Sequence, residues 1–208
     1  MENKVFISTV LSVNYFKNGA LSNFISRLYR CTAKYVDISK QNLTFNELKF
    51  LIGHGDVIEI KLSSVKDQNG NPFKFEDIIP FIPKIQKLHI VDIVYSSVIS
   101  QFLLDFSFKN KIERFEFGDA EILPDPAEFV EFILKNSSPF YSSHFTLYYR
   151  DGNALFDYSD DFGNDDDGFY IYDDDSEATT FRKTVRKVIS EKWKGPKRPY
   201  FSTSCRVY

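Results

Sequence analysis

Cysteine, histidine and tryptophan are scarce in this chain of 208 residues, which has two Cys, three His and one Trp. Cys31 and Cys205 lie far apart without metal-type or redox-type spacing, so we interpret them as reduced thiols rather than as a disulfide framework. His54, His89 and His144 form no His-x-His or His-x-x-x-His pair. The sequence therefore predicts neither a zinc site nor a histidine-based catalytic cluster.

Long apolar runs and the motifs of common enzyme classes are also missing. No stretch approaches the ~18 apolar residues of a membrane span, and the N-terminal residues lack the basic-then-apolar pattern of a secretory signal. Nucleophile-elbow, P-loop and dinucleotide-binding fingerprints do not occur. A net charge of −3 argues against a general nucleic-acid binder. We therefore expect an intracellular protein, cytoplasmic or nuclear, that is not an enzyme and uses no cofactor.

Phenylalanine (22) and tyrosine (12) are abundant, and apolar residues follow a recurring strand-then-helix pattern between Lys34 and Tyr149. Segments that alternate apolar and polar residues predict strands; these are 34–39, 57–62, 85–90, 112–117 and 144–149. Helices are predicted to begin at Thr44, Phe75, Ser97 and Asp125. Thr44 with Glu47 is a capping box, and Asp125 is an N-cap residue before a proline.

The last inward apolar residue of each strand can be aligned as one row, namely Ile38, Ile60, Ile90, Phe117 and Leu147. Their separations are 22, 30, 27 and 30 residues, which is near the period of leucine-rich repeats. We predict an α/β fold in which a leucine-rich-repeat-like solenoid of strands and helices carries a mainly parallel sheet. An ordinary α/β domain with a parallel sheet is the alternative, because alternating strands and helices predict both.

The predicted repeat domain covers residues 1–150 and begins with a capping helix built on Leu21, Phe24, Ile25 and Leu28. Residues 151–208 are predicted to form an acidic loop, a basic amphipathic helix over 176–193 and a mobile tail over 194–208. A calcium loop around Gly168 is not expected, because the first ligand position would fall on Gly163, which has no side chain. The basic helix is compatible with a nucleic-acid or membrane-surface site, or with docking of the acidic loop.

Two blocks, Tyr29 to Ser39 and Asn42 to Leu51, together with Glu128 to Asn136, resemble a large nematode-expanded family of F-box-associated proteins with FTH-like or leucine-rich-repeat-like regions. The resemblance covers about residues 16–149, and its motifs are structural. It implies an interaction domain of the kind that presents substrates to a cullin–RING ubiquitin ligase. No Leu-Pro-initiated F-box segment precedes Lys34, so the expectation concerns the interaction region alone.

Residues that precede the inward row should point to the opposite face of the sheet, because strand side chains alternate. We expect one outward row of Asp37, Glu59, His89, Glu116 and Thr146. Lys61 and Tyr148 should lie on one side of this row, and Lys87 and Arg114 on the other. Seven of these residues are the candidates for binding an unknown protein partner: Asp37, Glu59, Lys61, His89, Arg114, Glu116 and Tyr148.

The sequence thus favours a non-enzymatic protein-interaction module. One alternative is an enzyme with an unrecognised site, which would need a pocket that gathers titratable groups with shifted pKa values. The other is a calcium-binding or nucleic-acid-binding appendage in the C-terminal third.

Overall fold

A computed structural model describes residues 5–14, 17–94, 99–120, 123–149 and 177–205. The strands are β1 (Val5–Ile7), β2 (Val10–Val13), β3 (Leu28–Cys31), β4 (Tyr35–Ser39), β5 (Glu59–Ser63), β6 (Lys87–Val91), β7 (Arg114–Ala120), β8 (His144–Tyr149) and β9 (Tyr200–Cys205). The helices are α1 (Ala20–Ile25), α2 (Phe45–Ile52), α3 (Phe75–Ile78), the 3-10 turn η1 (Ile79–Phe81), α4 (Ile99–Asp105), α5 (Pro126–Asn136) and α6 (Glu177–Lys192).

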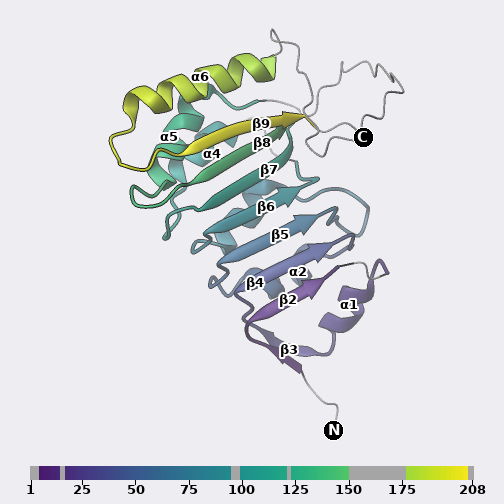
Figure 1. The fold of residues 1–208 in the computed structure, drawn as a ribbon. Helices are drawn as coiled ribbons and strands as arrows, with labels where there is room; N and C mark the ends of the chain where they lie inside the picture. Colours follow the sequence, from purple (N-terminus) through teal and green to yellow (C-terminus); the bar gives the residue numbers. More distant parts are fainter. Residues whose placement is uncertain (1–4, 15–16, 95–98, 121–122, 150–176, 206–208) are drawn as a thin grey trace, which may run out of the picture.

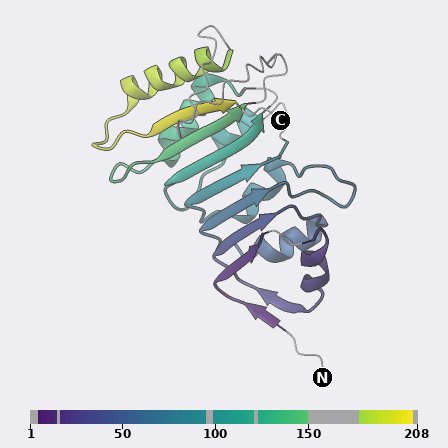
Figure 2. The ribbon, with the colours of Figure 1, turned by 45° about the vertical axis from the view of Figure 1, so that its right-hand side comes forward.

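Seven strands form one parallel sheet in the order β2-β4-β5-β6-β7-β8-β9, and β1 pairs with β3 in a separate parallel ladder. Helices α2, α4 and α5 lie behind the sheet, and its other face is open (Figures 1 and 2). The predicted parallel sheet in chain order is therefore confirmed for the five expected strands. The structure adds β2 at one edge and β9 at the other.

The same backbone hydrogen bonds recur where successive strands begin. One carbonyl accepts from two consecutive N–H groups of the next strand, and the acceptors are Thr9, Lys34, Ile58 and Gln86, which are 24 to 28 residues apart. Three strands also end alike, because the residues after β4, β5 and β6 all have positive φ: Lys40 (52°), Ser64 (53°) and Asp92 (59°). The chain thus repeats one local geometry along the sheet.

The buried row predicted from sequence needs one correction. In the register of the ladder, Ile38 lies beside Leu62, and Leu62 beside Ile90, followed by Phe117 and Leu147. Ile60 belongs instead to the neighbouring row, beside Val36. Each strand buries two alternating residues, so both rows are inside the core and apolar character could not show which residue of β5 aligns with Ile38.

Phenylalanine fills the space between the sheet and the helices towards its C-terminal half. The ring centroids of Phe75 and Phe117 are 4.5 Å apart, and those of Phe115 and Phe132 are 5.2 Å apart, both in edge-to-face arrangements. Such pairs contribute about 0.5–1.5 kcal/mol beyond the burial of their area. Part of the abundance of Phe in the sequence is thus explained by this aromatic core.

The C-terminal tail corrects a second prediction. Residues 200–205 form β9, which pairs in parallel with β8 along six residues, so the expectation of a mobile tail is wrong there. Phe201 is 1% exposed and packs against Phe129 of α5 and Phe181 of α6, at centroid distances of 5.6 and 5.9 Å. Residues 177–205 therefore share the hydrophobic core of the sheet.

The helix caps predicted from the sequence are confirmed. The Thr44–Glu47 capping box is present on α2, and the Asp125 side chain accepts from two backbone N–H groups of α5. The predicted N-terminal helix is shorter than expected, because Leu28 lies in β3 and only Leu21 is fully buried on α1. The acidic stretch before Glu177 and the expected helix start at Ser97 lie outside the described residues.

We expect Phe117→Ala to lower the free energy of unfolding by ~3–5 kcal/mol, because truncating a buried Phe removes its contacts and leaves a cavity. Phe117 is 4% exposed, whereas Phe140, the matched control for Phe140→Ala, is 83% exposed. Urea titration of both variants measures the difference. A loss below about 1 kcal/mol for Phe117→Ala would contradict its place in the core.

Candidate functional site

The open face of the sheet carries two adjacent rows of polar side chains. One row runs through Asp37, Lys61, His89, Glu116 and Thr146. The other runs through Tyr35, Glu59, Lys87, Arg114 and His144. These rows stand on neighbouring parallel strands, so their spacing is set by backbone hydrogen bonds and not by flexible loops.

The outward row predicted from the sequence, Asp37, Glu59, His89, Glu116 and Thr146, is therefore wrong at one position. Lys61 stands where Glu59 was expected, and Glu59 lies in the row of Lys87 and Arg114. This error has the same cause as the alignment of Ile60, instead of Leu62, with Ile38. A change in the register of a strand moves the residues of both its faces together. The face is consequently a mixture of both charge signs. Tyr148 lies two residues further along β8 than Thr146.

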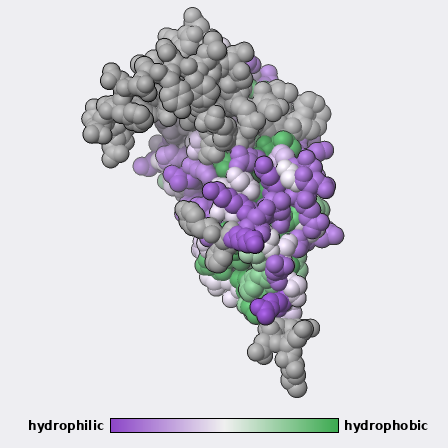
Figure 3. Space-filling view, turned by 90° about the vertical axis from the view of Figure 1, so that its right-hand side faces the viewer, coloured by the Kyte–Doolittle hydropathy of each residue, from purple (hydrophilic) through white to green (hydrophobic). Residues whose placement is uncertain are grey.

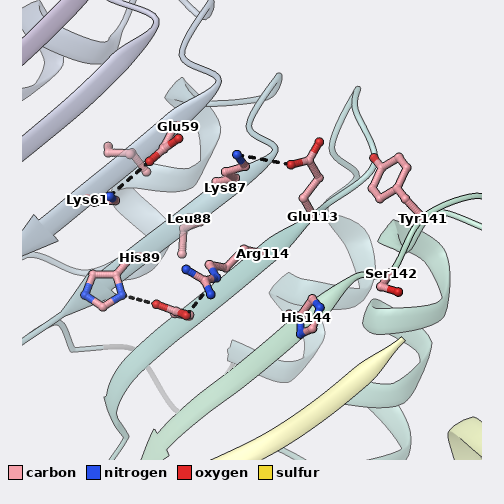
Figure 4. Close-up of a pocket in the computed structure, with 12 residues that line it drawn as sticks. Glu59, Lys61, Lys87, Leu88, His89, Glu113, Arg114, Tyr141, Ser142 and His144 are labelled. Carbon is pink, nitrogen blue, oxygen red and sulfur yellow. Dashed lines mark hydrogen bonds and ion pairs between the residues drawn. The ribbon is translucent and has the colours of Figure 1, made fainter. Parts of the chain in front are cut away.

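A groove of about 830 Å³ lies on this face over β5, β6 and β7 (Figure 4). Its wall is completed by Tyr141 and Ser142, from the segment before β8, and by His144 at the start of β8. The sequence analysis named His144 only when it excluded a histidine cluster, and it did not consider Tyr141 or Ser142. The sequence gives only a weak indication that these residues belong to a site. The segment before β8 shows no strand periodicity, and it comes close to β7 only when the sheet has formed.

Glu116 is the centre of the contacts inside the groove. Its carboxylate accepts a hydrogen bond from Nδ1 of His89 and lies 3.2 Å from Nε of Arg114. The His89 ring also meets Tyr148 edge-on, with centroids 6.5 Å apart. The side chain of Glu116 is 17% exposed and that of Arg114 is 62% exposed. Glu116 therefore orients two side chains whose outer parts face solvent.

Two looser ion pairs flank this centre. Nζ of Lys61 lies 3.4 Å from Glu59, and Nζ of Lys87 lies 3.5 Å from Glu113. Both lysine side chains are about half exposed, so each pair contributes roughly 0–1 kcal/mol to stability. Such pairs can exchange partners at little cost. Three cations and three carboxylates thus line the groove, and their formal charges cancel.

Tyrosine and histidine form the rim of the groove. The Tyr141 hydroxyl donates to the carbonyl of Lys111 at 3.0 Å, and burial, followed by the nearby Glu113 carboxylate, raises the pKa of Tyr141. His144 packs against Tyr200 of β9, with ring centroids 5.7 Å apart. Tyr141 stays protonated at neutral pH and acts as a hydrogen-bonding aromatic surface.

The groove lies toward the amino ends of the strands. Parallel α/β enzymes bind ligands outside the carboxyl ends of the strands, whereas this groove is bounded by Tyr141 and Glu113, which precede β8 and β7. Within the described ranges no group of three or more His, Cys, Asp or Glu could hold a metal ion. Burial raises the pKa of the Cys31 thiol, which disfavours the reactive thiolate.

Comparison with known proteins gives no family for this chain. No family model, curated protein or solved structure matches it. Among the described residues, no helix is long and apolar enough to cross a membrane.

We expect Glu116→Gln to lower the free energy of unfolding by about 1 kcal/mol, because it weakens partly exposed ion pairs without creating a cavity. Phe117→Ala on the opposite face of the same strand provides the contrast. Thermal and urea unfolding compare the two variants. A loss of about 3 kcal/mol or more for Glu116→Gln would mean that the polar network serves stability rather than binding.

The acidic stretch of residues 157–175 lies outside the described residues, so its lack of a specific metal site stays a prediction. Millimolar calcium should leave the melting temperature almost unchanged, because a solvated acidic loop does not enclose the ion. Differential scanning fluorimetry checks this, with magnesium as the control. A saturable rise at micromolar calcium would contradict it.

Proposed function

We propose that this chain is a non-enzymatic protein-interaction module that binds a protein partner through the open face of its sheet. The observation that supports this most is the groove over β5, β6 and β7, where Arg114 and His144 stand on strands of the sheet and Tyr141 lies in the segment before β8. Arginine and tyrosine are the residue types that most often dominate binding at protein interfaces.

The proposal includes a finer description of the fold as a leucine-rich-repeat-like solenoid. Support comes from the hydrogen bonds that recur every 24 to 28 residues and from the left-handed residues Lys40, Ser64 and Asp92 after successive strands. Solenoids commonly bind partners on an extended sheet face formed by equivalent positions of each repeat. In this chain those positions are the two polar rows.

Recognition in this proposal is electrostatic and depends on register. Across three neighbouring strands, one row places Glu59 beside Lys87 and Arg114, and the next row begins with Lys61 and ends with Glu116. A partner with the complementary pattern gains several charge pairs at once, while a uniformly charged surface meets repulsion somewhere on the face. A face of mixed charge therefore favours selective binding over non-specific binding.

The biological role proposed here follows the resemblance to F-box-associated proteins. In that role the face would recognise a substrate for an F-box-type ubiquitin ligase. The recurring strand geometry and the polar face are compatible with this role. Identification of the captured partner decides between a ligase substrate and another protein.

The test is a charge reversal on the open face. A partner isolated by affinity capture and then purified should bind Lys61→Glu/Arg114→Glu at least about tenfold more weakly than the unchanged chain, because two exposed cations of the face are inverted. Isothermal titration calorimetry measures the affinities, and circular dichroism verifies folding.

Lys109→Glu/Lys187→Glu is the matched control, since it alters the net charge equally and both residues are exposed outside the groove. It should bind like the unchanged chain. Equal affinity of the folded face variant and this control would place the partner elsewhere on the molecule.

A further inference from the structure

The end of the molecule built from β1, β2, β3 and β4 has an unusual surface. Of the ten large hydrophobic residues that are exposed in the described part of the chain, five belong to these four strands. We call them the N-terminal surface: Val5, Phe6, Val10, Tyr29 and Tyr35. Figure 3 shows hydrophobic side chains gathered toward this end, while the middle of that view is largely hydrophilic.

Packing among these residues holds the N-terminal surface in place. The rings of Phe6 and Tyr29 lie 6.0 Å apart on the paired strands β1 and β3, and the guanidinium of Arg30 lies 5.8 Å above the ring of Phe6. Val10 and Tyr35 are direct neighbours in the β2–β4 ladder. They are 57% and 42% exposed, so both present apolar area to solvent.

Cations predominate in the part of the chain that forms this surface. Between Asn3 and Val36 the sequence contains five Lys or Arg and no Asp or Glu, although the whole chain has a net charge of −3. Arg27, Arg30 and Lys34 are exposed, and no described carboxylate forms an ion pair with them. This differs from the groove, where every cation has a carboxylate beside it.

Contiguous exposed apolar area bordered by polar groups is typical of binding sites. The exposed charged residues between Arg27 and Lys34 are all cations, although Glu59 lies beside Tyr35, so the complementary ligand carries carboxylates. Val5 and Val10 add aliphatic area that a phosphate backbone does not use.

We infer that the N-terminal surface docks an acidic peptide segment of another protein, whose aromatic or aliphatic side chains pack on Phe6, Tyr29 and Tyr35. Its carboxylates pair with Arg27, Arg30 and Lys34. None of these residues lines the groove over β5, β6 and β7, although Tyr35 lies beside Glu59 at its edge. A chain with both sites contacts its partners at the groove and at the β1–β4 end of the molecule.

The experiment is fluorescence anisotropy with the full chain and three labelled synthetic peptides of equal length. The first alternates Asp with Phe, the second alternates Lys with Phe, and the third alternates Asp with Ser. The first peptide should bind at least about tenfold more tightly than either of the others, because it alone supplies both charge and apolar area. Its affinity should fall as salt is raised.

Two surface variants and two controls locate the site. Phe6→Ser/Arg30→Glu, or Arg27→Glu/Lys34→Glu if the first variant does not fold, should weaken binding of the Asp–Phe peptide by at least about tenfold. Phe140→Ser/Arg198→Glu alters exposed residues elsewhere and should bind normally. The groove variant Lys61→Glu/Arg114→Glu should also bind normally, which separates this inference from the proposed function.

Several results would overturn the inference. Equal affinity of the Asp–Phe and Lys–Phe peptides would show that the cations of the surface do not contribute to binding. Tighter binding of a labelled oligodeoxythymidine or of phosphatidylserine vesicles through the same residues would assign the surface to nucleic acid or membrane. A dimer in light scattering that Phe6→Ser/Arg30→Glu abolishes would assign it to a second copy of the chain.

Discussion

The in-register burial of two inward residues per strand is the constraint on which the rest of this structure depends. Val36, Ile60, Leu88, Phe115 and Phe145 form one such row under the helices. A shift of one residue would expose such a row and bury charged side chains, so the apolar core fixes the pairing of all neighbouring strands. The composition of the open face is a consequence of this pairing.

The charge pattern of the open face depends strongly on that register. Lys61 stands beside Asp37 and His89, and Glu59 stands beside Lys87. With β5 displaced by two residues, the same sequence would present a largely acidic row with cations on both sides, which suits a different partner. Core packing therefore determines the charge pattern available for recognition.

The two edges of the sheet carry different kinds of side chain. At β9, Arg186 of α6 donates from Nε to the carbonyl of Phe201 at 2.8 Å and its guanidinium lies over the Tyr200 ring, so the edge is covered by a charged side chain. Natural sheets use such charges to prevent unwanted strand pairing. The β1–β4 end instead exposes apolar side chains, such as Val10, beside unpaired cations. The two edges of the sheet therefore differ in the amount of apolar area that they expose.

The sequence by itself determined the parallel strand–helix order, the Thr44 and Asp125 caps and the apolar face of α6, because alternation, capping and helical periodicity act over a few residues. Only the tertiary structure decided the alignment of Ile38 with Leu62 rather than Ile60, and the pairing of β9 with β8. Residues 200–205 have a weak strand pattern and form β9 because Phe201 enters a core made by residues far away in the chain. The groove could not be predicted from the sequence either, because its side chains come from separate strands whose register no local pattern specifies.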